Sequence, residues 1–359
     1  MRFYQPFLGR EVDLDQWTRE MVALHFDPDG GTPYWLRWQE ERGIDVRREV
    51  QGFPDLPRVF GLFDGDVLRR IPATDFLPRR RLQDPSLHPR VYETGGTTGA
   101  PKRVVMTTYW RTMAAWTSHV LDGLGVPRSL HILALMPPGG NNNAGVFARY
   151  LARERGALSY HVNFDPRWVK KLILRGAHQE VEAYIAHLFD QAEAVTETQP
   201  VGMLFTTGRL LQEPRCRELV HRYGIRVVMH GGAALDPDTY RMLREEWYAG
   251  CFFCGEYGNT LMGVAPQDTR SPESREHLLY IPCFPYFVVE AVDPEDPFRV
   301  LPYGQRGRVK ITVLCEDFFI PGMLERDEAE RVPGREPYPW DWVRNPMSPE
   351  ALTGREGVY

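Results

Sequence analysis

The residues from Tyr92 to Arg103 combine three features that suit the binding of a polyphosphate. They read Tyr-Glu-Thr-Gly-Gly-Thr-Thr-Gly-Ala-Pro-Lys-Arg. The glycines let the backbone turn tightly, and successive backbone N–H groups in such a turn bind an anion. Threonine hydroxyls add donors, and a lysine adds a positive charge. The sequence therefore predicts a phosphate loop that consists of Thr94, Gly95, Gly96, Thr97, Thr98, Gly99 and Lys102.

Two other phosphate motifs do not fit this loop. A Walker A loop needs Gly-Lys-Ser/Thr, whereas Pro101 precedes Lys102 and Arg103 follows it. The dinucleotide fingerprint G-x-G-x-x-G is absent. Only four of the 43 Lys and Arg residues are lysines. A position that stays lysine in such a chain favours a role for a compact ammonium group.

The elements that position this loop follow from the hydrophobic pattern. From about residue 90, short apolar runs alternate with helical patterns. This alternation predicts an α/β fold with parallel sheets flanked by helices. A helix is expected to begin at Asp236-Pro237, an N-cap followed by proline at the first helical position. The expected strands are Arg90–Glu93, His131–Met136, Leu158–Phe164, Val201–Phe205, Arg226–Met229 and Cys251–Cys254.

Three parts are expected along the chain. Residues 1–89 predict helices and irregular segments, with Asp13 or Asp15 as a helix N-cap. Residues 90–279 predict the α/β core. Residues 280–359 predict a small β-subdomain and a tail, because the pattern there becomes rich in strands. The expected strands of this last part are Phe287–Val292 and Gly307–Cys315.

Composition excludes several functions. The chain has 359 residues, a net charge of −5 and 25% charged residues, which argues against a nucleic-acid partner. No apolar run approaches the ~20 residues of a membrane span, so no membrane partner is expected. Five cysteines, an odd number, argue against a disulfide framework and favour a cytoplasmic location. The Arg79–Arg81 run reads as a solvated surface.

The Tyr92–Arg103 segment closely resembles the phosphate loop of a known superfamily. This is the adenylate-forming superfamily of acyl- and aryl-CoA synthetases, luciferases and nonribosomal-peptide adenylation domains, whose usual loop is Thr-Ser/Gly-Gly-Thr-Thr-Gly-x-Pro-Lys-Gly. This chain departs from it at Gly95 and Arg103. The resemblance implies an enzyme that uses ATP and Mg²⁺ to join a carboxylic acid to AMP with release of pyrophosphate.

Two further segments resemble the superfamily in the expected order. His230–Asp236 is similar to its Gly-Gly-x-x-Leu loop, and Gly255–Thr260 is similar to its Tyr-Gly-x-Thr-Glu motif. The resemblance implies that Tyr257 lies on the adenine ring and that Thr260 lies near the α-phosphate. It also implies that Lys102, Thr94 and Thr260 take part in catalysis, and that the nucleotide contacts Gly232, Ala233, Glu256 and Gly258 in addition to the phosphate loop.

The ribose is expected to meet an acid near residue 327. Pro321–Asp327 resembles the superfamily segment that ends in a ribose-binding aspartate, which makes Asp327 the candidate. The alignment there is loose, so Asp317 and Glu325 stay open as alternatives.

The acid substrate is expected at the carboxyl ends of the parallel strands, where open α/β sheets bind ligands. The resemblance implies that it contacts Asn142, Asn143, Thr206, His230, Gly231 and Gly255. The asparagines also suit a plain turn, and His230 also suits a hydrogen-bonded loop histidine. His25–Pro28 and Asp165–Lys170 resemble a compact subgroup of phenazine and other aromatic antibiotic pathways, which implies an aromatic acid.

Two departures from the superfamily set expectations about the chemistry. Leu261 replaces the glutamate that helps to hold magnesium, so Mg²⁺ either arrives with ATP or is held by Glu256. The chain stops at Tyr359 and has no lysine after Lys310, so no C-terminal lid domain with its catalytic lysine is expected. The resemblance then implies slow adenylation and transfer of the product to an amine, a thiol or a carrier protein.

Other functions stay open from the sequence. A nucleotide- or acyl-adenylate-binding protein without efficient turnover, acting as a scaffold or chaperone, is the main alternative. An acyl-protein synthetase that works inside a complex is a third. Cys251-x-x-Cys254 has no second pair at zinc spacing, so no metal-ligating residue is predicted. Gly-x-Ser-x-Gly is absent, which argues against an α/β-hydrolase.

Overall fold

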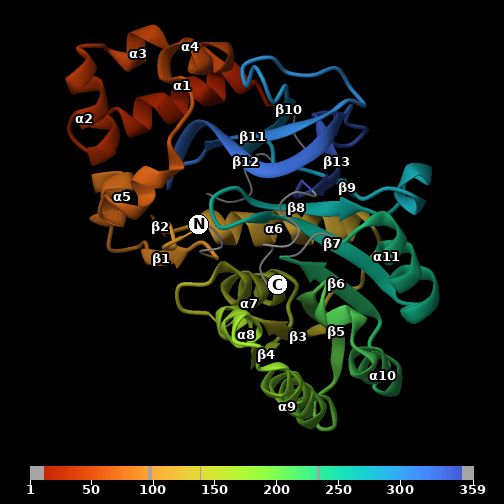
Figure 1. Cartoon of the computed structure of the whole chain (residues 1–359). Coiled ribbons are helices and arrows are strands. Elements are labelled where there is room, and N and C mark those ends of the chain that lie inside the picture. Colours follow the sequence, from red (N-terminus) through yellow and green to blue (C-terminus); the bar gives the residue numbers. More distant parts are fainter. Residues whose placement is uncertain (1–11, 96–98, 138, 233–234, 350–359) are drawn as a thin grey trace. The chain divides into compact units, whose positions relative to one another are not determined.

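The computed structural model describes residues 12–95, 99–137, 139–232 and 235–349. Figure 1 shows the helices and strands of the chain, coloured along the sequence. Backbone contacts divide the chain into two compact units. Unit 1 comprises Met1–Met113, Asn259–Gly263 and Ile281–Val343, and unit 2 comprises Ala114–Gly258, Val264–Tyr280 and Arg344–Tyr359. Each unit is described by itself below. The domain ranges expected from the sequence stay a prediction.

Unit 2 is built on a sheet with the strand order β9-β8-β7-β6-β5-β3-β4. The pairs β4–β3, β3–β5, β5–β6 and β6–β7 are parallel, and β8–β9 is antiparallel. All of β5 is buried, as is typical of parallel strands covered on both faces. The strands are β3 (His131–Met136), β4 (Ser159–Asn163), β5 (Val201–Thr207), β6 (Val227–Gly231), β7 (Phe252–Asn259), β8 (Gly263–Asp268) and β9 (Leu279–Tyr280).

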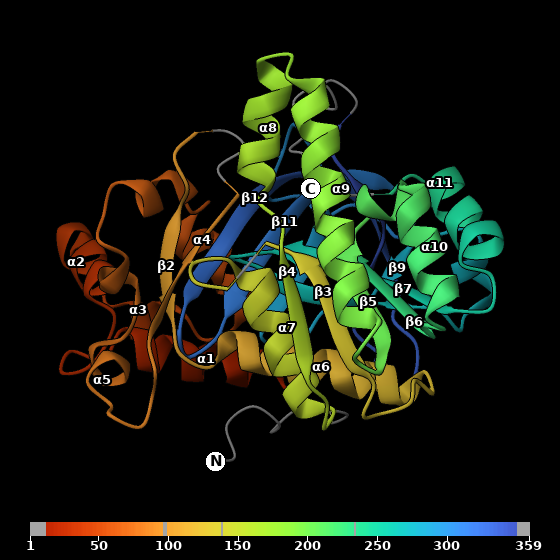
Figure 2. The same ribbon diagram turned by 90° about the horizontal axis from the view of Figure 1, so that it is seen from below.

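Helices flank this sheet, and Figure 2 shows α7 and α9 over β3 and β4. Asp236 accepts hydrogen bonds from the backbone N–H groups of Asp238 and Thr239, with Pro237 next in the chain, as the sequence predicted. The helices are α6 (Tyr109–Gly123, which begins in unit 1), α7 (Asn143–Glu154), α8 (Pro166–Leu174), α9 (His178–Thr196), α10 (Pro214–Arg222) and α11 (Pro237–Met242). Short helical turns lie at Leu210–Gln212, Leu243–Trp247 and Pro272–Arg275.

Unit 1 contains an antiparallel sheet of β10 (Phe287–Val292), β11 (Arg306–Leu314) and β12 (Phe319–Val332). This sheet confirms the strands expected after residue 280. A separate antiparallel pair joins β1 (Arg90–Glu93) to β2 (Arg103–Met106). The assignment of Arg90–Glu93 to the parallel sheet is therefore wrong, because the connection to β2 is too short for a parallel crossover. The boundary between the units falls within β13 (Trp342–Met347).

The N-terminal helices of unit 1 pack on β11 and β12 through indole groups. Trp17 donates from Nε1 to the Leu314 carbonyl, and Trp35 donates from Nε1 to the Phe319 carbonyl. Asp13 is the N-cap of α1, one of the two caps expected. The helices are α1 (Leu14–His25), α2 (Pro33–Arg42), α3 (Val46–Glu49), α4 (Leu56–Phe60) and α5 (Arg79–Leu82), with short turns at Phe53–Asp55, Gly65–Arg69 and Ala73–Phe76.

No helix among the described residues is long and apolar enough to cross a membrane.

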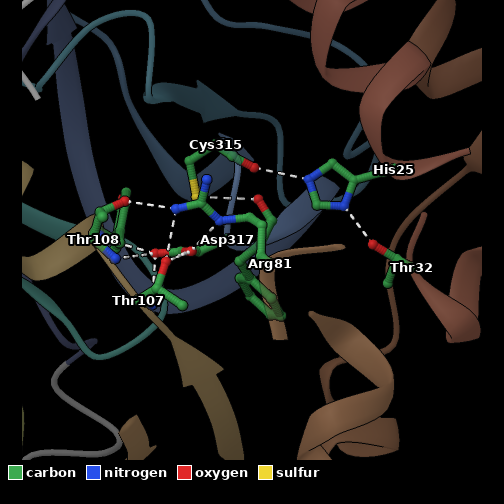
Figure 3. Close-up of polar contacts among 9 residues, drawn as sticks. His25, Thr32, Arg81, Thr107, Thr108, Cys315 and Asp317 are labelled. Carbon is green, nitrogen blue, oxygen red and sulfur yellow. Dashed lines mark hydrogen bonds and ion pairs between the residues drawn. The ribbon is translucent and has the colours of Figure 1, made fainter. Parts of the chain in front are cut away.

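His25 ends α1 inside the core of unit 1. Its ring has no exposed surface, with Nδ1 at 2.6 Å from the Thr32 hydroxyl and Nε2 at 2.8 Å from the Cys315 carbonyl (Figure 3). Burial lowers the pKa of His25 to about 4, against a smaller opposite effect of the Cys315 carbonyl. The imidazole is therefore neutral in the folded protein at pH 7.

His25 should make unit 1 less stable in mild acid. In the unfolded chain its pKa is near 6.5, so as the pH falls below 6.5 the unfolded state binds a proton that the folded state refuses. This contribution lowers the free energy of unfolding by about 2.5 kcal/mol between pH 7.5 and pH 4.5. In His25→Gln, the free energy of unfolding should fall less between pH 7.5 and pH 4.5 than it does in the parent protein. Urea unfolding at both pH values measures this difference.

His88→Gln is the matched control, because His88 is exposed. It should keep the pH dependence of the parent protein. An unchanged pH dependence in His25→Gln would contradict the assignment.

Candidate functional site

The ends of the predicted phosphate loop are joined by two hydrogen bonds. The Thr94 N–H donates to the Lys102 carbonyl, and the Lys102 N–H donates to the Thr94 hydroxyl, each at 3.0 Å. Gly99 has φ +148°, which favours glycine. The predicted residues Gly96, Thr97 and Thr98 lie outside the described residues. In the described part, the loop is a closed turn between β1 and β2.

Lys102 lies near one acid of β12, Glu325. A Cβ placed on Gly65 would lie 2.6 Å from the Lys102 Nζ, so the end of the lysine side chain lies close to this glycine. Burial raises the pKa of Glu325 to about 7, while Asn259 and the Lys102 charge lower it and Asp327 raises it. The structure thus brings Lys102 near Glu325, with Asp327 close by, inside unit 1.

Thr260 joins the same group of residues through the end of β1. Its hydroxyl donates to the Glu93 carbonyl at 3.0 Å, one residue before Thr94. Asn259 Oδ1 accepts from the N–H groups of Leu261 and Met262 at 2.9 and 3.0 Å. Leu261 itself is buried at 2% exposure, so it belongs to the core. Unit 1 therefore assembles Thr94, Lys102, Thr260, Glu325 and Asp327.

Asp317 has a different role. Its carboxylate accepts from Arg81 Nε and from the N–H groups of Thr107, Thr108 and Tyr109 at 2.7–2.8 Å (Figure 3). These donors lie at the start of α6, so Asp317 holds that start in place. Asp327 and Glu325 remain the ribose candidates. The Arg81 side chain is only 15% exposed, so the interpretation of Arg79–Arg81 as a solvated run is wrong for Arg81.

In unit 2, the acid-site candidates lie on two faces of the sheet. Thr206 pairs with His230, and His230 with Gly255, so these three residues share one face. Gly231 pairs with Glu256 and lies on the other face with it. The Thr206 hydroxyl donates to the Leu135 carbonyl at 3.1 Å and is therefore used within the sheet.

His230 is buried at 2% exposure, and its Nε2 has no hydrogen-bond partner among the residues that the structure describes. Its ring packs against Phe253 at 5.2 Å, and burial lowers its pKa to about 4. A Cβ on Gly255 would lie 2.8 Å from the His230 ring and 3.0 Å from the Tyr280 hydroxyl. Glycine at 255 is therefore required for the ring to lie here.

Glu256 is buried at 7% exposure, and neither of its carboxyl oxygens has a hydrogen-bond partner in the described part of the chain. Burial raises its pKa to about 8. The Thr117 hydroxyl favours the charged form of Glu256 but lies outside hydrogen-bonding geometry, and it also lacks a partner among these residues.

The other candidates of unit 2 are placed as follows. The Tyr257 ring packs against Tyr280 at 5.6 Å, and Gly258 and Gly232 have φ values of +159° and +81°. Asn142 Oδ1 accepts from the Ala144 N–H at 2.9 Å as the N-cap of α7, and Asn143 begins that helix. This is the turn role that the sequence left open. Ala233 lies outside the described residues.

Sequence reasoning missed several residues of both units. Gln267 accepts from the Gly255 N–H at 2.7 Å and donates to the Tyr240 hydroxyl at 2.8 Å, which fixes the middle of β7. Thr117 and Gly65 are the other omissions. No motif marks any of them, because each acts through a contact made only in the folded unit. No cluster of three metal-ligating side chains occurs within the described ranges.

Comparison with known proteins gives the class of fold. No protein-family profile and no curated protein match the chain. Solved structures do match, and the chain has the adenylate-forming fold. One matching structure is 2-hydroxyisobutyryl-CoA ligase in complex with 2-HIB-AMP and CoA in the thioesterification state. The comparison gives a TM-score of 0.67 and 16% identity, and it covers 96% of this chain and 69% of the ligase. An open conformation of that ligase gives a TM-score of 0.64 at 16% identity, covering 97% and 75%.

Asp317→Asn should destabilise unit 1. The change removes the negative charge opposite the nearly buried Arg81 and leaves an amide donor facing backbone N–H groups. Breaking a buried ion pair from one side costs about 3 kcal/mol. Urea unfolding monitored by tryptophan fluorescence measures this loss.

Asp238→Asn is the control, because its side chain is 86% exposed and a surface ion pair contributes little. Equal losses in the two variants would show that the Asp317 contacts do not support the fold.

Proposed function

We propose that this protein is an enzyme that uses ATP to convert a carboxylic acid into its acyl-adenylate, with release of pyrophosphate. The observation that carries the proposal is the pair of hydrogen bonds that joins Thr94 to Lys102, with the Lys102 charge near enough to Glu325 to lower the pKa of that acid. The adenylate-forming fold supports it. The ligase with this fold was solved with an acyl-AMP and CoA, so a thiol acceptor is the preferred second step.

The chemistry requires positive charge and donors around one phosphorus atom. A substrate carboxylate oxygen attacks the α-phosphorus of ATP, the new P–O bond forms, and the bond to the bridging oxygen breaks so that pyrophosphate leaves. Charge spreads over the phosphate oxygens in the transition state. Lys102 supplies positive charge there. Asp327 or Glu325 accepts the ribose hydroxyls, and the Tyr257 face packs on the adenine.

The described residues do not form a protein site for Mg²⁺. Leu261 is apolar and buried, and Glu256 is a single carboxylate, without two further ligating side chains grouped around it in the described ranges. Mg²⁺ prefers several oxygen ligands and commonly binds substrate phosphates. We therefore assign the metal to the ATP phosphates and not to Glu256.

The substrate is proposed to be an aromatic acid of specialised metabolism, and the acceptor an amine, a thiol or a carrier protein. Phe205 and Phe147 contact each other at 5.8 Å beside the end of β6, which offers an aromatic wall. A second candidate function, binding of a nucleotide or acyl-adenylate without efficient turnover, is favoured by the buried leucine at position 261.

Lys102→Ala should lower acid-dependent exchange of pyrophosphate into ATP by about 100-fold, since one preorganised donor to a transition-state charge contributes that much. The exchange is first screened over aryl, fatty and hydroxy acids with the parent protein. Lys171→Ala is the matched control, because Lys171 is exposed on α8, and it should exchange like the parent.

Two results would overturn this picture. Unchanged exchange in Lys102→Ala removes Lys102 from the mechanism. ATP binding seen by calorimetry, with no exchange for any acid, identifies a binding protein in place of an enzyme.

A further inference from the structure

Glu256 differs from the other deeply buried acids of the described chain. Those acids are Asp268 and Asp317. Asp268 accepts from the N–H groups of Arg270 and Ser271, and Asp317 accepts from three backbone N–H groups and Arg81. Glu256 accepts from none of the described residues. A buried polar group without a hydrogen bond costs stability, so Glu256 calls for a functional explanation.

The position of Glu256 is one where open α/β sheets bind ligands. It lies towards the carboxyl end of β7, in register with Gly231, the last residue of β6. Ligands of such sheets bind beyond the carboxyl ends of the strands. The Thr117 hydroxyl of α6 is near enough to this carboxyl group to lower its pKa, and it too makes no hydrogen bond of ordinary geometry with the described residues. Two unpartnered polar side chains from different elements thus occur together.

A glycine and aromatic residues are among the neighbours of Glu256 on this face. A Cβ on Gly231 would meet the Glu256 Cβ at 3.4 Å and the Phe205 ring at 3.8 Å. Phe205 in turn contacts Phe147. The carboxyl group therefore lies next to a glycine and near aromatic rings, a combination that suits a ring carrying one polar substituent.

We propose that Glu256 and Thr117 form a subsite for a hydrogen-bond-donating substituent, an amino or hydroxyl group, on the acid substrate. This inference rests on the proposed function, because it specifies the acid that the enzyme activates. The substituent donates to a carboxyl oxygen of Glu256, and the Thr117 hydroxyl supplies a second contact. An acid without the substituent leaves both groups unpaired, so the subsite selects against it.

The burial of Glu256 agrees with this role. Its raised pKa, about 8, means that the free protein keeps the carboxyl group largely protonated at pH 7. A protonated carboxyl both donates and accepts one hydrogen bond, which matches a hydroxyl group. An amino substituent is matched by the carbonyl oxygen of the same group.

The test compares matched acids in parent protein, Glu256→Leu and Glu256→Gln. The pairs are benzoate against the aminobenzoate and hydroxybenzoate isomers, and hexanoate against 6-hydroxyhexanoate. The parent should prefer at least one donor-bearing acid, measured as the ratio of kcat/KM values in pyrophosphate exchange. Glu256→Leu should reduce this ratio by about tenfold or more, and Glu256→Gln should restore part of it for hydroxyl-bearing acids.

Two further measurements keep the result interpretable. Glu256→Leu should unfold in urea at the same or a higher concentration than the parent, because an unpaired buried carboxyl is replaced by an apolar group. Calorimetric titration with the same acids, without ATP, measures binding directly. Glu245→Gln, an exposed acid of unit 2, is the control for both measurements.

The outcomes separate this inference from the proposed function. Exchange with a preference that Glu256→Leu leaves unchanged overturns the subsite and keeps the enzyme. Glu256-dependent binding of donor-bearing acids without any exchange keeps the subsite and overturns the enzyme. A large loss of stability in Glu256→Leu would show a structural role for Glu256 and would overturn the subsite.

Discussion

The candidate site depends on the backbone closure between Thr94 and Lys102. In the antiparallel register of β1 and β2, Glu93 lies opposite Arg103, and this register brings Thr94 next to Lys102. Side chains alternate across a strand, so a shift of one residue would direct Lys102 to the opposite face. The same closure places Thr94 next to Glu93, whose carbonyl accepts from the Thr260 hydroxyl. Thr94, Lys102 and Thr260 are thus joined by one short hairpin.

Two buried acids of this chain differ in their hydrogen bonding, and the difference distinguishes a structural role from a functional one. The cost of burying Asp317 is offset by hydrogen bonds from Arg81 and from three backbone N–H groups at the start of α6. The Glu256 carboxyl group accepts no hydrogen bond from the described residues, so nothing among them offsets the cost of its burial. A protein that satisfies one buried carboxylate so fully has the means to satisfy another. The unsatisfied one is therefore the better candidate for contact with a ligand.

The sequence predicted the elements whose burial is uniform. Strands such as His131–Met136 are continuous apolar runs, and Asp236-Pro237 is an unambiguous helix start. It did not predict β12, because Phe319–Val332 contains Pro, Gly and many charges and is only partly buried. At the site, the candidate phosphate loop was recognisable as a prediction, since its residues are contiguous. Gly65, Thr117 and Gln267 were not, because their contacts with Lys102, Glu256 and Gly255 come from distant elements.

The turn after β7 shows how the chain can depart at one position from the motif that it resembles and keep the surrounding geometry. Asn259 Oδ1 accepts from the N–H groups of Leu261 and Met262, and the Tyr109 hydroxyl donates to the Met262 carbonyl. The turn is therefore held by side chains on either side of position 261, and Thr260 keeps its contact with Glu93. Leucine at 261 adds apolar burial in place of a metal-binding carboxylate. Under the proposed function, the charge on the phosphates is then neutralised by Lys102 and by the metal that ATP carries, which places a greater electrostatic demand on Lys102.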